Sequence, residues 1–225
     1  MPNVGKETYR WLRKYKFENL DFDLIEDKKE QPMELFVLNT TTLFWELCLK
    51  RVKELENGYQ YAKLNNQKIN MALLERAALE TFAVAVRQII SLENLVNSKF
   101  ENEEENKEYA ERTKKLFLGM RSLDKNNLIT STNIVSHLEK ANFYLKKYGE
   151  CNLLEMYESL SNYCHPNLAG LTGNYYPKIL EIKSQSTGNE IKTNEYFLPI
   201  LLLFKHFDEK VQELKEISKN SSDYA

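Results

Sequence analysis

The sequence predicts an all-α fold, a bundle of about six to seven helices. Apolar residues recur at helical spacing through most of the 225 residues. Only seven glycines and five prolines are present, which is few for a β-fold with its many turns. With 42% hydrophobic and 28% charged residues, the chain has the composition of a globular protein that can bury a substantial core.

Charge and cysteine content limit the class of protein. A formal net charge of −2 provides no general attraction to nucleic acid or to anionic membranes, so no DNA binding is indicated. The three cysteines form no Cys-x-x-Cys pair, and we see no secretory leader. The longest apolar run, Leu198 to Phe204, is too short to span a bilayer. We therefore expect a cytoplasmic protein with reduced thiols and no membrane segment.

Residues 1–32 differ in character from the rest and are expected to form an N-terminal amphipathic arm. Aromatic residues alternate with Arg and Lys between Tyr9 and Phe17. Such a pattern can stack on bases and meet phosphates, or it can be a helix whose aromatic side chains pack on the domain while the cations face water. We favour the second interpretation because the overall charge does not support the first.

Residues 33–218 are expected to form a single helical domain, followed by a frayed tail at 219–225. The segment 68–98 is apolar on almost every side, which is typical of a central helix. Gly58 is expected to end the helix before it. His137 lies beside an apolar seam and is interpreted as a surface residue. The expected helices cover residues 34–57, 68–98, 101–120, 132–148, 153–164 and about 198–218.

Four polar residues of the central helix, Arg76, Glu80, Arg87 and Asn94, follow one another at steps of four, seven and seven. These steps place them on one narrow line, which we call the polar stripe. The polar stripe can be the solvated edge of the helix, or an internal polar layer that faces another helix and requires partners there. We take the solvated edge as the default.

The most polar junction of the chain follows the helix at 153–164, which must end near Cys164 because Pro166 cannot continue it. The helix dipole favours the cationic form of His165, so this residue can act as an acid or base. Equally, His165 and Asn162 can simply cap the helix, and capping is our default. An irregular insertion is expected at about 167–197, with 179–193 forming either a β-hairpin or a loop.

No Gly-rich phosphate loop, nucleophile elbow or His-Glu-x-x-His pair is present, and the histidines are far apart. We therefore expect no metal and no cofactor.

Two segments carry a resemblance to a known family. One is Leu74-Glu75-Arg76-Ala77-Ala78-Leu79-Glu80, and the other is Leu160-Ser161-Asn162-Tyr163-Cys164-His165-Pro166-Asn167. With these segments the chain resembles the HEPN (higher eukaryotes and prokaryotes nucleotide-binding) helical superfamily and uncharacterised bacterial proteins related to it. The resemblance implies a helical bundle, often dimeric, of toxin–antitoxin and phage-defence systems. Many members are metal-independent RNases with the motif Arg, a polar residue, three further residues, then His.

In this chain the motif histidine would be His165, but Leu160 occupies the arginine position. Leucine supplies no cation for the developing phosphorane charge, so we expect a non-catalytic HEPN-like protein that binds a protein partner or a nucleotide or RNA ligand. The alternative is a metal-independent RNase toxin in which His165 is the acid/base and Arg76 the displaced cation. A third interpretation makes the junction purely structural. The candidate site residues are Arg76, Glu80, Asn162, His165, Asn167 and Tyr175.

Overall fold

The computed structural model describes residues 2–17, 33–118, 133–146, 152–164 and 196–222. Every regular element in these ranges is a helix, and they contain no strand, which confirms the all-α prediction. No helix in these ranges combines the length and apolarity needed to cross a bilayer. The insertion expected at 167–197, with its hairpin or loop at 179–193, lies outside the described residues.

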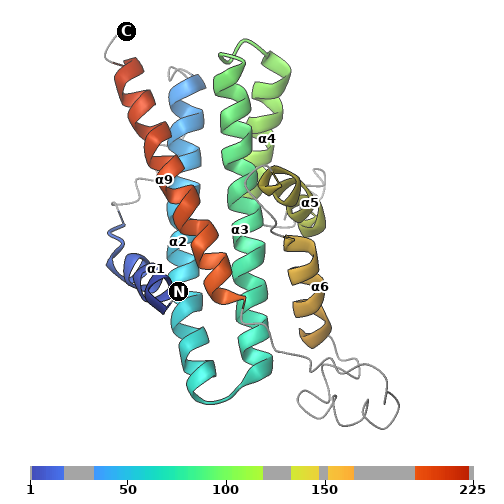
Figure 1. Ribbon diagram of the computed structural model, residues 1–225. Helices are drawn as coiled ribbons and strands as arrows, with labels where there is room; N and C mark the ends of the chain where they lie inside the picture. Colours follow the sequence, from blue (N-terminus) through green and yellow to red (C-terminus); the bar gives the residue numbers. More distant parts are fainter. Residues whose placement is uncertain (1, 18–32, 119–132, 147–151, 165–195, 223–225) are drawn as a thin grey trace.

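A long antiparallel hairpin of α2 and α3 forms the frame of the bundle (Figure 1). Helix α9 packs along this hairpin, α1 packs on α2 and α9, and α4 folds back beside α3. Helices α5 and α6 pack on α3 and on each other. The helices of the described residues are α1 (Pro2–Lys14), α2 (Met33–Leu64), α3 (Lys68–Asn97), α4 (Glu103–Leu118), α5 (Ile134–Leu145), α6 (Leu153–Cys164) and α9 (Phe197–Ser222).

Helix α3 is the central helix, as its apolar circumference predicts, because α2, α4, α5, α6 and α9 all pack against it. Its Phe82 is fully buried and meets two rings of α9 edge-on. The ring centroids lie 5.1 Å from Phe204 and 5.6 Å from Phe207. Edge-to-face geometry of this kind adds to the free energy gained by burying the rings.

The prediction that Gly58 ends the preceding helix is wrong. Helix α2 continues through Gly58, and the chain reverses only at Asn66, which has φ 53°. The backbone N–H of Gln67 closes the turn on the carbonyl of Ala62 at 2.8 Å. Asparagine tolerates the left-handed conformation, so it replaces glycine as the stop. A glycine inside a helix costs only about 1 kcal/mol, which the packing of α2 on α3 outweighs.

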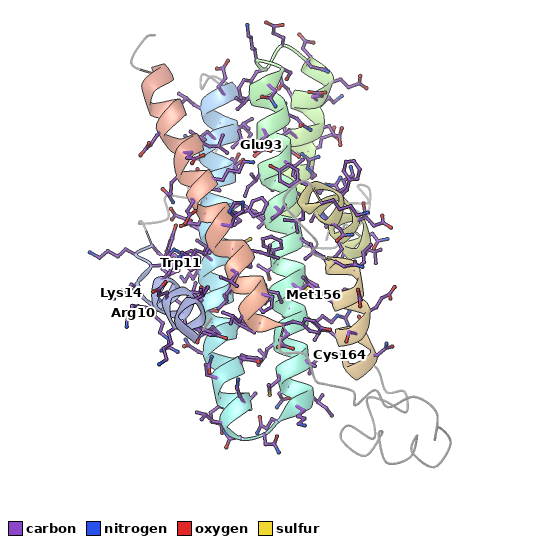
Figure 2. All side chains as sticks on the ribbon, in the orientation of Figure 1. Arg10, Trp11, Lys14, Glu93, Met156 and Cys164 are labelled. Carbon is purple, nitrogen blue, oxygen red and sulfur yellow. The ribbon has the colours of Figure 1, made fainter. Side chains whose placement is uncertain are left out.

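Helix α1 is amphipathic, as expected for the N-terminal arm, and it is packed into the fold. Leu12 is fully buried in the main core cluster, and Trp11 packs partly buried against it. Arg10 and Lys14 are exposed and point away from the bundle (Figure 2). The interpretation that the aromatic side chains pack on the domain while the cations face water is therefore confirmed for the described part of the arm.

Helix α9 begins with a cap from another helix. The buried carboxylate of Glu75 on α3 accepts the backbone N–H groups of Tyr196 at 2.8 Å and Phe197 at 3.1 Å. Pro199 is tolerated because the first turn has no intrahelical acceptor for an N–H at that position. The helix extends to Ser222, so the tail is helical beyond residue 219, where we expected fraying to begin.

A second buried carboxylate joins α9 to α2 and to the residue that follows α1. Asp208 of α9 accepts the indole N–H of Trp45 on α2 at 2.9 Å. It also accepts the hydroxyl of Tyr15, just after α1, at 3.2 Å. Since a buried carboxylate is costly without donors, these two bonds fix the position of α9 relative to α1 and α2.

Candidate functional site

Arg76 and Glu80, the first two residues of the polar stripe, face α6. The guanidinium Nε of Arg76 donates to Glu80 at 2.9 Å, and Nη2 donates to the Tyr157 hydroxyl at 2.8 Å. The guanidinium also lies 4.9 Å from the centroid of the Tyr157 ring. The Arg76 and Glu80 side chains are 25% and 33% exposed. The pair therefore combines both interpretations: the two side chains are partly exposed and bind each other, and Arg76 also has the partner on a neighbouring helix that an internal polar layer requires.

The arrangement keeps Arg76 charged. Burial by itself lowers the pKa of Arg76, but the hydrogen bond and charge of Glu80 and the contact with Tyr157 more than offset this and raise it. Arg76 therefore remains a cation at every physiological pH, with donors already bound to Glu80 and Tyr157.

Cys164 is the last residue of α6 (Figure 2), and its thiol interacts with the same arginine. Burial raises the pKa of the Cys164 thiol, while the charge of Arg76 and a hydrogen bond to it act in the opposite direction. The structure thus brings the Arg76–Glu80 pair to the end of α6 at which His165 follows in the sequence. Asn162 is exposed on α6, and His165, Asn167 and Tyr175 lie outside the described residues.

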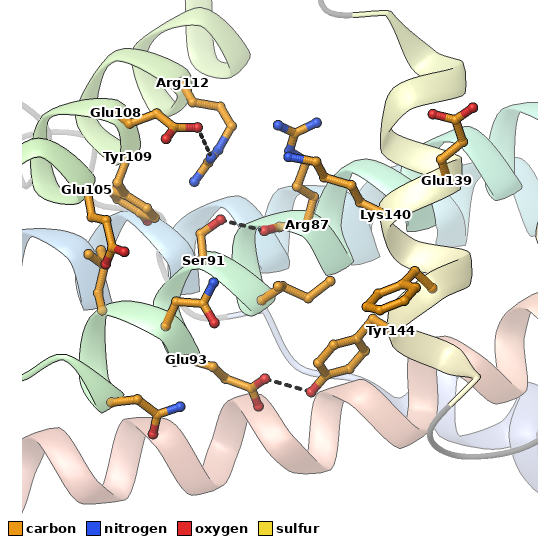
Figure 3. A pocket seen from close by; sticks show the side chains of 15 residues that line it. Arg87, Ser91, Glu93, Glu105, Glu108, Tyr109, Arg112, Glu139, Lys140 and Tyr144 are labelled. Carbon is orange, nitrogen blue, oxygen red and sulfur yellow. Dashed lines mark hydrogen bonds and ion pairs between the residues drawn. The ribbon is translucent and has the colours of Figure 1, made fainter.

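A pocket of about 650 Å³ lies further along α3, between α3, α4 and α5 (Figure 3). Arg87, the third residue of the polar stripe, contributes to its wall, and its Nη1 donates to Ser136 Oγ of α5 at 3.4 Å. Asn94 lines the same pocket. The polar stripe therefore faces α6 at one end and this pocket at the other.

A second arginine enters the pocket from α4. Arg112 is 13% exposed and lies 3.4 Å from Glu108, whose own side chain is 69% exposed. Burial lowers the pKa of Arg112, and the charge of Arg87 lowers it further, while Glu108 and Tyr109 raise it. Burial also lowers the pKa of Arg87, with Glu108 opposing. The two guanidinium groups thus lie close enough to repel each other.

His137 borders a smaller cavity of about 280 Å³ that shares Arg87, Glu108 and Arg112 with the pocket. The prediction that His137 is a surface residue is wrong, because its side chain is 1% exposed. Helix α5 packs on both α3 and α6, and His137 borders the same cavity as Arg87 of α3 and Arg112 of α4, so a face of α5 beyond its apolar seam is covered. Burial lowers the pKa of His137 to about 4, and the charges of Arg87, Arg112 and Lys140 contribute to this shift.

At the opposite end of the pocket the negative charge of Glu93 is balanced by Lys210. Tyr144 of α5 donates its hydroxyl proton to Glu93 of α3 at 2.6 Å, and Lys210 of α9 contacts both groups. Glu105 and Glu139 line the pocket as exposed side chains. At the other end the two arginines share a single carboxylate, the largely exposed Glu108, as their acidic neighbour in the pocket.

Sequence reasoning missed this second site because its members come from three helices and none forms a motif. The available signal was Arg87, which stands on the polar stripe two turns beyond Glu80. Nothing in the sequence places Arg112 or His137 opposite Arg87, because that depends on how α4 and α5 pack.

The described residues contain no group of three or more His, Cys, Asp or Glu that would hold a metal ion. Within these ranges Cys48 and Cys164 are both free thiols. Comparison of the chain with protein families, with curated proteins and with solved structures found no match.

Proposed function

We propose that this chain is a non-catalytic helical binding protein of the HEPN-like type, which binds a nucleotide-bearing ligand, single-stranded RNA included, at the end of α6. The observation that supports this most is the position of Arg76, held by Glu80 and Tyr157 beside the last residue of α6. The guanidinium is partly exposed, so its remaining donors can reach a phosphate.

The same contacts argue against catalysis by this arginine. An arginine that stabilises a phosphorane must direct its donors at the developing charge. Here the Nε donor is bound to a carboxylate that offsets the charge, and Nη2 is bound to a phenol. Binding a phosphate in its ground state requires fewer free guanidinium donors than stabilising a phosphorane does. The geometry therefore favours a binding protein over an RNase.

The setting that the family resemblance implies, a bacterial defence or toxin–antitoxin system with a homodimer or a protein partner, belongs to the same proposal. It rests on the segments around Arg76 and His165 and on the all-α bundle.

Two measurements on the full chain test the proposal. Total RNA incubated with wild type and with His165→Ala under chelating conditions should give the same profile for both. Cleavage that disappears in the variant would instead support the RNase alternative. In fluorescence anisotropy, a labelled single-stranded RNA should bind wild type and bind Arg76→Gln about tenfold more weakly.

Arg51→Gln is the matched control, because Arg51 is an exposed arginine of α2. It should bind RNA as wild type does. Equal affinity of Arg76→Gln and wild type, or no binding by wild type, overturns the proposal. Circular dichroism melts of each variant establish that the comparison is made between folded proteins.

A further inference from the structure

The pocket between α3, α4 and α5 contains an excess of buried cationic and donor groups at one end. Arg87 and Arg76 are eleven positions apart on α3, so the two sites are separated by about 16 Å along the helix axis. This pocket is therefore independent of the site proposed at the end of α6.

The two arginines have few acceptors within the described residues, and Arg112 pairs there with Glu108 through Nη1 alone. Arg87 forms no ion pair there, and its one side-chain partner is the Ser136 hydroxyl at 3.4 Å. The Nε of Arg112 is buried with no acceptor in the described part of the chain. Figure 3 shows both side chains reaching from α3 and α4 into the space between α4 and α5. Two like charges facing one space are stabilised by an anion placed between them.

His137 is an independent indication of a ligand. Its side chain is almost wholly buried, and neither Nδ1 nor Nε2 has a hydrogen-bond partner among the described residues. A neutral imidazole always carries one N–H donor. Leaving such a donor unpaired costs about 1–3 kcal/mol, and an acceptor bound in the adjoining cavity would remove that cost.

The carboxylates of the pocket do not occupy this place. Glu93 is engaged by Tyr144 and Lys210 at the other end. Glu108 is mostly exposed and reaches Arg112 from the rim, while Glu105, Glu111 and Glu139 are exposed. The cations and the imidazole therefore line the interior, and the acidic side chains surround its mouth.

We propose that Arg87, Arg112 and His137 form a binding site for the phosphate group of a small phosphate ester. Donors from three helices approach one space, which suits the tetrahedral oxygens of a phosphate better than a planar carboxylate. A phosphate dianion also balances the two guanidinium charges. The cavity of about 280 Å³ that all three residues line would hold the phosphate. The pocket of about 650 Å³, which shares Arg87 and Arg112 with this cavity, lies in the range of small-molecule sites and would hold the organic part of the ligand.

Thermal unfolding of the full chain with inorganic phosphate, and with acetate at matched ionic strength, tests the site. Phosphate should raise the melting temperature of wild type more than acetate does. Arg112→Gln should lose this gain, and its affinity for phosphate should fall about tenfold. Without phosphate, Arg112→Gln should melt no lower than wild type, because the substitution removes the repulsion from Arg87. Lys107→Gln, at an exposed cation of the same helix, should retain the gain.

A second measurement needs no variant. Titration of ¹⁵N-labelled wild type with inorganic phosphate should shift the imidazole signals of buried His137 and leave those of exposed His206 in place. Equal stabilisation by acetate and phosphate, or an unmoved His137 signal, overturns the proposal. Binding of RNA at the end of α6 should be the same for Arg112→Gln and wild type, so the two sites can fail separately.

Discussion

Burial of His137 makes the stability of this protein depend on pH between about 4 and 6.5. The folded-state pKa is about 4, whereas an unfolded chain has the ordinary value of about 6.5. The unfolded state therefore binds an additional proton inside this window, and stability falls as the pH is lowered through it. The loss is about 2 kcal/mol at pH 5 and levels off at about 3 kcal/mol below pH 4.

The imidazole is surrounded by fixed charges from three helices. Arg87 of α3, Arg112 of α4 and Lys140 of α5 each disfavour its protonation. Glu108 and Glu111 line the same cavity, so the effect of His137 has to be separated from that of the carboxylates.

Urea denaturation of wild type and His137→Gln at pH 7.5 and pH 5 makes this separation. Effects of groups that the two proteins share cancel in this comparison, and wild type should lose about 2 kcal/mol more than the variant. His206→Gln, at the exposed histidine of α9, should follow wild type. Parallel losses in wild type and His137→Gln, or an NMR titration of His137 with a midpoint near its ordinary value, would refute the reasoning.

Three further predictions concern the frame of the bundle. Glu75→Ala should lower the free energy of unfolding by about 1–3 kcal/mol in denaturant titrations, because it leaves two N–H groups at the start of α9 without an acceptor; an unchanged midpoint would contradict this. Asp208→Ala should cost about 1–3 kcal/mol by leaving the Trp45 indole unpaired, whereas Glu209→Ala at the exposed neighbour should be neutral, and equal melts would exclude the role assigned to Asp208. Gly58→Ala should raise stability by about 0.5–1 kcal/mol, because alanine lowers the conformational entropy of the unfolded chain. The new Cβ would lie 3.4 Å from a leucine side chain, an ordinary contact, and a lower melting temperature would show that this contact is too tight.

Much of the fold was predictable from the sequence because helical periodicity is a local property. The apolar circumference of residues 68–98 marks the central helix, and Pro166 marks the end of α6 at Cys164. In contrast, the end of α2 could not be read locally. A glycine at 58 and an asparagine at 66 are both acceptable stops, and the packing of α2 against α3 decides between them.

The candidate sites likewise combine features that follow from local sequence with features that depend on packing. The sequence by itself determined that Arg76, Glu80, Arg87 and Asn94 share one line on a helix, since that follows from 3.6 residues per turn. Only the tertiary structure decided what faces the line, because α5 and α6 cover it and bring Tyr157 to one end. The burial of His137 and the approach of Arg112 to Arg87 arise from helices that are distant in the chain. Local patterns carry no information about such distances, so these features depend on packing alone.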